Sequence, residues 1–188
     1  MNETLIYSYI ERLGNLLRTD SRRDVAEYGL QPIHLEVLHY LSLCNRYSDT
    51  PMAVTDYMGQ TKGTVSQTLN VLEKKGLLSK HPDSSDKRMT HLKVSNAGKK
   101  LLQASIPSSL FVNACEQLTE QSQTQTVKVL QELLQAIQRS NNMKSFGVCH
   151  TCRYNNQKID NRYFCELTKE ALSNEDVHLI CREHENIT

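Results

Sequence analysis

The chain has 188 residues, of which 38% are hydrophobic and 23% charged, so it can build a core and is not expected to be disordered throughout. It contains no apolar run near the roughly 18 residues that span a bilayer. Residues 1–4 include an acid and lack the basic segment of a secretory signal. We therefore expect a cytoplasmic protein with no membrane partner.

The net charge of +1 hides an uneven distribution. Residues 52–100 carry nine Lys and Arg against four Asp and Glu, so the rest of the chain is acidic. A basic segment inside a near-neutral protein is typical of a module that contacts nucleic acid. A solvated charged face gives the same composition, so the motifs within the segment must decide between the two.

Hydrophobic spacing predicts two helices before the basic segment. Residues 3–19 place apolar side chains on one face of a helix. After a polar stretch, a second helix opens at residues 30–33, where Pro32 is tolerated in the first turn, and ends near Arg46.

The next segment predicts a helix-turn-helix. A short helix over residues 52–58 ends at Gly59, and the turn 59–61 supplies a glycine for a left-handed conformation and a threonine that can cap the following helix. That helix runs from about 62 to 75 and is stopped by Gly76. Two helices joined by a three-residue turn that contains glycine form this motif.

A β-hairpin is predicted directly after the second of these helices. Residues 77–81 and 89–94 read as short strands, and residues 82–86 between them are rich in turn formers. The tip of the hairpin is polar and partly basic.

Two more helices are predicted beyond the hairpin. One is capped by residues 95–98 and continues to about Thr119, with a bend near Pro107. The other covers residues 123–139 and carries a narrow apolar seam formed by Val127, Leu130, Leu134 and Ile137. Such a seam suits a helix of a second subunit, and packing within the same subunit explains it equally well.

The helix over residues 62–75 has an apolar face for the core and a polar face that could read DNA. The polar face carries Lys62, Gly63, Thr64, Ser66, Gln67, Asn70 and Lys74. Gln and Asn can pair bidentately with adenine in the major groove, and Ser and Thr can bond bases or phosphate. Gly63 allows the helix N-terminus to approach the DNA backbone. Taken alone, such a face is more often merely exposed to solvent.

The order of these elements, together with four short motifs, resembles the MarR family of winged-helix regulators. The motifs are residues 63–69 (GTVSQTL), 72–78 (LEKKGLL), 86–88 (DKR) and 92–98 (LKVSNAG). The resemblance covers residues 33–102 closely and the flanking helices by pattern.

The resemblance implies a triangular homodimer that binds double-stranded DNA. Each recognition helix would enter a major groove, and each wing would reach the adjacent minor groove with Lys87 and Arg88, Asp86 orienting Arg88. A narrow minor groove concentrates negative potential, which attracts arginine. A two-fold dimer reads two half-sites, so the operator should be palindromic. Most members repress transcription and release DNA when a small molecule or an oxidant acts on the dimer.

The expected fold is mainly α (α+β), with four parts. Residues 1–30 form an N-terminal dimerisation helix, residues 31–98 a winged helix-turn-helix DNA-binding domain, residues 99–142 the C-terminal dimerisation helices, and residues 143–188 a small Cys-rich metal module.

The last part lies beyond the family pattern and holds four of the six cysteines, namely Cys149, Cys152, Cys165 and Cys181. A module this small cannot build an adequate hydrophobic core and needs a cross-link or a bound metal to fold. Four thiols in a reducing compartment indicate a metal. Zinc is the first candidate, although the second half is not another Cys-x2-Cys pair. An iron–sulfur cluster, which accepts isolated cysteines, and a disulfide switch without metal are the alternatives.

The other possible ligands and thiols are single residues. His150 and His184 could substitute for a cysteine, though each alone is typical of a surface histidine. Cys44 and Cys115 sit on predicted helices and are interpreted as small buried hydrophobes.

Two other classes of function compete with a DNA-binding regulator. An enzyme is not expected, because the chain has neither a glycine-rich phosphate loop nor a Cys/His pair in a catalytic motif. The second alternative is a winged-helix protein-interaction module with a structural zinc tail and no operator of its own. The basic pair Lys87 and Arg88 at the wing tip disfavours it.

Overall fold

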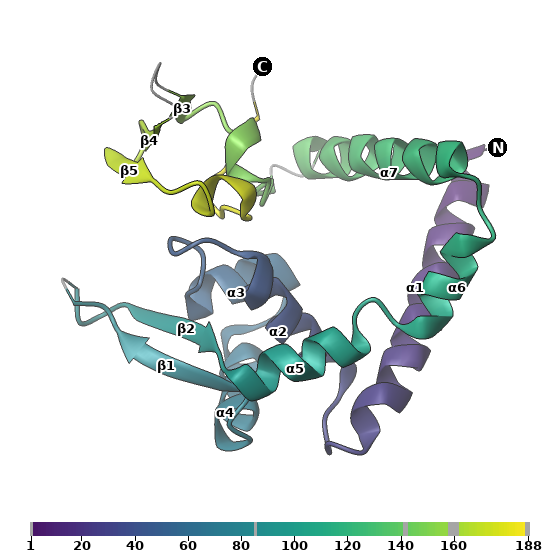
Figure 1. Cartoon of the computed structure of the whole chain (residues 1–188), viewed down its shortest axis with the longest axis horizontal. Helices are drawn as coiled ribbons and strands as arrows, with labels where there is room; N and C mark the ends of the chain where they lie inside the picture. The colour runs from purple at the N-terminus through teal and green to yellow at the C-terminus, as the bar shows by residue number, and fades with distance from the viewer. Residues whose placement is uncertain (1, 85, 141–142, 158–161, 187–188) are drawn as a thin grey trace.

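The computed structural model describes residues 2–84, 86–140, 143–157 and 162–186 (Figure 1). The elements are α1 (Asn2–Ala26), α2 (Pro32–Leu43), α3 (Pro51–Met58), α4 (Lys62–Lys74), β1 (Leu78–Pro82), β2 (Thr90–Val94), α5 (Asn96–Ser105), α6 (Ser109–Glu116), α7 (Glu120–Ser140), η1 (Cys149–Thr151), β3 (Asn155–Gln157), β4 (Tyr163–Cys165), β5 (Glu170–Leu172) and η2 (Asp176–His178), where η marks a 3₁₀ turn. None of the described helices is both long enough and apolar enough to cross a membrane.

The main core lies between α2, α3, α4, α5 and the hairpin. Its most deeply buried large side chains include Leu35, Leu38 and Tyr40 of α2, Leu72 of α4 and Leu92 of β2. The predicted helix-turn-helix is confirmed as α3 and α4. Its turn has the expected chemistry, with Gly59 in the left-handed region at φ 61° and Thr61 accepting a hydrogen bond from the backbone N–H of Thr64 at 3.2 Å.

The predicted hairpin is also confirmed. β1 and β2 pair antiparallel, from Leu78 opposite Val94 to Pro82 opposite Thr90. Of the predicted turn residues, Ser85 lies outside the described residues. The hairpin projects from the core as a wing, which places its tip away from the helices (Figure 1).

Two helix predictions were wrong, one in its length and one in its continuity. α1 continues seven residues past Thr19, because the charged stretch that follows includes the buried Asp20 and Val25 and packs as helix. The single bent helix expected to reach Thr119 is two helices, α5 and α6. Pro107 has no N–H to continue the first, and Ser108 caps the second by accepting a hydrogen bond from Phe111 N at 3.3 Å.

Helices α1, α6 and α7 form an arm that extends away from the core (Figure 1). Neither α6 nor α7 has a buried residue, and the predicted seam of α7 is about half exposed, for example 51% at Leu130 and 55% at Leu134. The apolar face of α1 is exposed in the same way, from Leu5 to Leu17. Nothing in the described part of the chain covers these faces.

The C-terminal module is a three-stranded antiparallel sheet, in the order β3–β4–β5, with the turns η1 and η2. It lies against the side of the core that carries α3 (Figure 1). A parallel bridge between Cys44 and Ile180 joins the two.

Gly98 tests the packing of the wing on α5. A Cβ at this position would overlap the backbone oxygen of Leu77 and lie 2.8 Å from Cγ1 of Val94, and the backbone atom cannot move away. We expect Gly98→Ala to lower the free energy of unfolding by about 1–3 kcal/mol in denaturant titrations. Gly14→Ala is the control, because a Cβ there meets nothing within 4 Å. Equal stabilities of the two variants would contradict this packing.

Candidate nucleic-acid interface and cysteine pocket

The predicted recognition face of α4 is exposed along its whole length. The core side of the helix buries Val65, Leu69 and Leu72, which leaves the opposite side open. All seven residues of α4 that were predicted to contact DNA are exposed, namely Lys62, Gly63, Thr64, Ser66, Gln67, Asn70 and Lys74. Their contacts with DNA remain a prediction.

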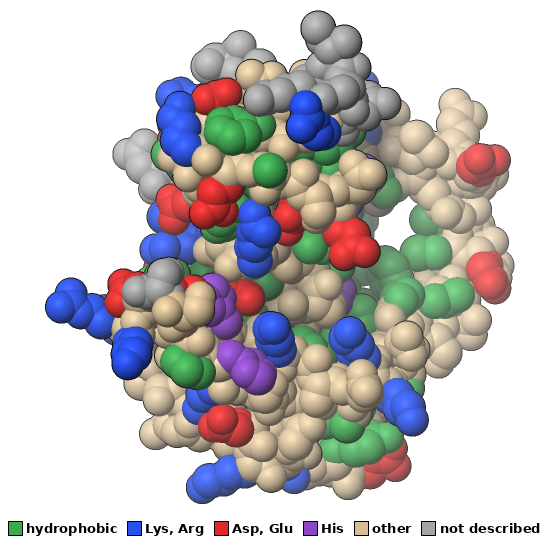
Figure 2. Space-filling model, turned by 60° about the vertical axis from the view of Figure 1, so that its left-hand side comes forward, with side chains coloured by type: hydrophobic (Ala, Val, Ile, Leu, Met, Phe, Trp, Pro, Cys, Tyr) green, Lys and Arg blue, Asp and Glu red, His purple; other side chains and the backbone are tan. Residues whose placement is uncertain are grey.

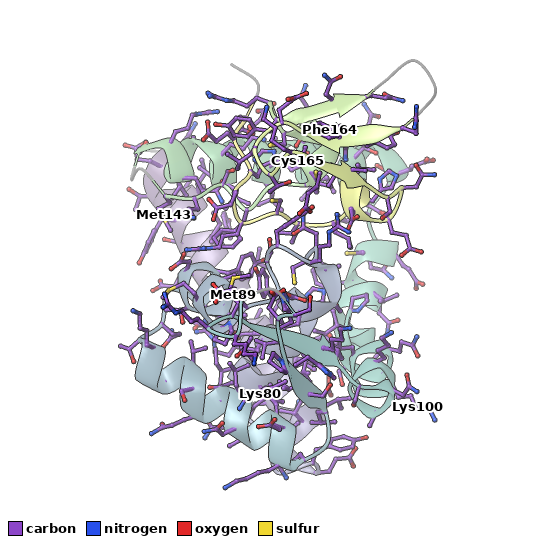
Figure 3. All side chains as sticks on the ribbon, turned by 90° about the vertical axis from the view of Figure 1, so that its left-hand side faces the viewer. Lys80, Met89, Lys100, Met143, Phe164 and Cys165 are labelled. Atoms are coloured by element: carbon purple, nitrogen blue, oxygen red, sulfur yellow. The ribbon has the colours of Figure 1, made fainter. Side chains whose placement is uncertain are left out.

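Lys80 ties α4 to the wing, and sequence reasoning missed it. From β1, its Nζ donates to Asn70 Oδ1 at 2.7 Å and to Glu73 Oε2 at 2.8 Å, both on α4. Figure 3 looks onto this side of the molecule, with α4 and the hairpin both on it and Lys80 where they meet. A lysine ten residues from its partner carries no pattern that could have revealed this contact from sequence.

The wing tip presents Lys87 and Arg88 to solvent. Its turn is held by two carboxylates, because Asp83 Oδ1 accepts from Asp86 N at 2.7 Å and Asp86 Oδ1 accepts from Arg88 N at 3.0 Å. Asp86 therefore orients the backbone of Arg88. Lys and Arg side chains gather on the face that carries the hairpin (Figure 2).

His91 of β2 ties the wing to the loop before α3 and was likewise not anticipated. Its Nδ1 lies 2.5 Å from Asp49 Oδ1, and its Nε2 lies 3.1 Å from Asp83 Oδ2. Because ionised carboxylates only accept hydrogen bonds, the doubly protonated ring satisfies both partners. Hydrogen bonding to Asp49, and then to Asp83, raises the pKa of His91. The loop before α3 is thereby linked to the wing.

The structure brings the four C-terminal cysteines to one small pocket. Cys149, Cys152, Cys165 and Cys181 all line it, together with Asn45, Tyr47 and Leu172 among others. All four are free thiols. Burial, and then the neighbouring thiols, raise the pKa of Cys149 to about 12, so the unligated thiol is neutral at pH 7. Within the described residues, no three His, Cys, Asp or Glu side chains are arranged to hold a single metal ion.

Neither histidine considered as a substitute ligand lines this pocket. His184 is buried, its Nδ1 lies 2.6 Å from Ser145 Oγ, and its Nε2 lies 2.9 Å from Thr151 Oγ1. His150 is exposed and packs near the ring of His178.

The two remaining cysteines differ from each other. Cys44 is buried, and burial raises its pKa to about 12, as a small buried hydrophobe requires. Cys115 is only partly buried, so the same interpretation was wrong for it, because α6 belongs to the exposed arm.

A wide groove lies between α2, β2 and α5, with a volume of about 580 Å³. Its walls combine the apolar Leu92 and Leu102 with three cations and one acid, namely Arg46, Lys93, Lys99 and Asp49. Such a lining suits a small amphipathic anion.

A helix-turn-helix followed by a β-hairpin defines the winged-helix class of fold. Within that class, residues 28–89 match the sequence model of the MarR family. No curated protein shows a significant sequence match to the chain.

Solved structures with the same fold include several MarR-type proteins. MepR of S. aureus in its DNA-binding conformation is 24% identical, with a TM-score of 0.60 over 70% of this chain and 98% of that chain. A MarR transcriptional regulator from Methanosarcina mazei Go1 is 17% identical, with a TM-score of 0.63 over 72% and 98%. Apo MarR of E. coli is 16% identical, with a TM-score of 0.54 over 68% and 95%. The fold of this chain is therefore the MarR-type winged helix.

The bond between His91 and Asp49 predicts a pH dependence of stability. The pKa of His91 in the folded protein is raised above its usual value near 6.5. The stabilisation that the charged ring gives the folded state is therefore fully present below about pH 6.5, and it is lost as the pH rises through the higher folded-state pKa. We expect the difference in unfolding free energy between the wild type and His91→Gln to be larger at about pH 6 than at about pH 9. A difference that is independent of pH would contradict the charged pair.

Proposed function

We propose that this protein is a DNA-binding transcriptional regulator, not an enzyme, that represses transcription from a palindromic operator. The observation that carries the proposal is the shared orientation of α4 and the wing, joined by Lys80. A polar helix beside a positively tipped hairpin suits a major groove and the adjacent minor groove. The solved MepR–DNA complex, 24% identical with a TM-score of 0.57, supports the same use of the fold.

The active form in this proposal is a homodimer. Exposed apolar side chains run along α1, α6 and α7, and contiguous patches of this kind mark interaction sites. A two-fold partner would cover the same faces on both chains and set the distance between the two recognition helices. The groove beside Arg46 and Lys99 supports a small anionic effector as a further partner.

Arg88 and Gln67 test the DNA contacts. In gel-shift titrations at fixed salt against a duplex selected by the wild type, we expect Arg88→Ala to weaken binding while light scattering still reports a dimer. Gln67→Ala and Asn70→Ala should each cost about 1–3 kcal/mol on the selected duplex and little on random DNA.

Arg22→Ala is the matched control, because Arg22 is an exposed arginine of α1 that belongs to neither α4 nor the wing. Unchanged affinity of Arg88→Ala would remove the wing from the interface. A wild type that selects no duplex would favour the protein-interaction alternative.

We further propose that the cysteine pocket holds a metal centre, either zinc or an iron–sulfur cluster, that responds to metal or redox status. The support is that four free thiols, from parts of the chain up to 32 residues apart, share one pocket. Thiolates are the preferred ligands of both centres. Metal binding would have to displace the protons that these thiols carry.

The metal content distinguishes the two centres. Protein purified without oxygen should be brown if it holds a cluster, or colourless with one zinc per chain by elemental analysis. Cys165→Ser should lose the metal, and Cys115→Ser, outside the pocket, should keep it. Protein with neither metal would contradict the proposal and leave the thiol–disulfide switch.

A further inference from the structure

The last ligand candidate, Cys181, lies on a segment that is bonded directly to the DNA-binding domain. Immediately before it, Ile180 N donates to Leu43 O at 2.8 Å, and Ile180 O accepts from Asn45 N at 2.9 Å. Immediately after it, Arg182 N donates to Ser48 Oγ at 2.8 Å. The cysteine pocket is thus closed on one side by the loop between α2 and α3, residues 44–50.

Asn45 of this loop has a buried donor that forms no hydrogen bond of good geometry within the described part of the chain. The residue is 1% exposed and lines the cysteine pocket. Its Oδ1 is used twice, accepting from Tyr47 N at 3.1 Å and from Ser48 Oγ at 2.8 Å. Its Nδ2 makes no hydrogen bond of good geometry to a described residue. Burial raises the pKa of the Cys181 thiol and the Asn45 side chain lowers it in part, so this amide already lies next to that sulfur. A buried N–H without an acceptor is unfavourable, which calls for an explanation.

We infer that Asn45 donates an N–H···S hydrogen bond to the metal–thiolate centre and so couples the centre to the DNA-binding domain. This inference rests on the proposed metal centre and on the proposed regulation of DNA binding. A thiol is a weak acceptor, whereas a metal-bound sulfur is anionic and accepts well. The side chain that the unligated pocket leaves unsatisfied is thus satisfied when the centre is present.

The same loop continues to the DNA-contacting wing. Asp49, next to Ser48, accepts from Leu92 N through its backbone oxygen at 2.7 Å and binds His91 through its carboxylate. His91 in turn contacts Asp83, which holds the turn at the wing tip. The state of the centre therefore acts on the position of the wing through one short loop.

A second contact holds the module to the helix-turn-helix. The guanidinium of Arg182 donates to Asp56 Oδ2 from Nε at 2.8 Å and from Nη2 at 2.7 Å. Asp56 lies on α3, the first helix of the motif. Because Arg182 follows Cys181 directly, movement of this ligand also displaces its bond to α3.

Asn45→Asp is one test, because it keeps an oxygen for Tyr47 and Ser48 and exchanges the N–H donor for a carboxyl oxygen, which adds a charge when it is ionised. Asn45→Ala is the second variant, and Asn156→Ala, an exposed asparagine of β3, is the matched control. Only preparations that circular dichroism shows to be folded, and that elemental analysis shows to contain the metal, are compared.

The first measurement does not depend on DNA. If the protein holds zinc, Co²⁺ replaces it and the sulfur-to-cobalt charge-transfer band is recorded; if it holds a cluster, its reduction potential is measured. Hydrogen bonds to sulfur set both properties. We expect both Asn45 variants to shift the band or the potential, and Asn156→Ala to match the wild type. Spectra or potentials identical to the wild type in both Asn45 variants overturn the inference.

The second measurement is affinity for the selected duplex, with the centre loaded and after its removal by a chelator. We expect removal to weaken wild-type binding at least tenfold and to change the binding of the Asn45 variants less than twofold. An equal effect of removal on wild type and variants overturns the coupling. If no duplex is bound by any form, the regulatory proposal fails, while the spectroscopic measurement still decides the contact of Asn45 with the centre.

Discussion

The directions in which α4 and the wing face are fixed by one buried apolar core. Val65, Leu69 and Leu72 of α4 lie in the same core cluster as Leu92 of the wing. Because helical side chains repeat every 3.6 residues, burial of these three directs the opposite face of α4 to solvent. Leu92 fixes β2 through the strand alternation, which leaves Lys93 exposed. Two different periodicities thus anchor the helix and the hairpin to one core.

The loop between α2 and α3 serves two neighbours at once. Toward the module its backbone pairs with Ile180, and toward the wing Asp49 binds both Leu92 and His91. A loop whose backbone is hydrogen-bonded from both sides has few alternative positions. In most proteins a connection of this length would be free to vary. Here it is a rigid spacer between a cysteine pocket and a hairpin.

The sequence could predict the elements whose signals are local. Glycines 59 and 76 and the caps at Thr61 and Ser95 mark the ends of helices, and strand alternation gives the hairpin. The break at Pro107 was underestimated because the apolar spacing continues across it. Local signals could not reveal contacts between distant residues. His91 meets a carboxylate 42 positions away, and Arg182 meets one 126 positions away.

The exposed arm has a consequence for how the protein responds to dilution. Helices in proteins gain most of their stability from packing of their apolar face. Helix α7 has no buried residue, so it gains little stability from the rest of its own chain. If a second chain covers these apolar faces, the fraction of protein with an ordered arm depends on the protein concentration. Melting temperature would then rise with protein concentration, and the arm would loosen before the winged core does.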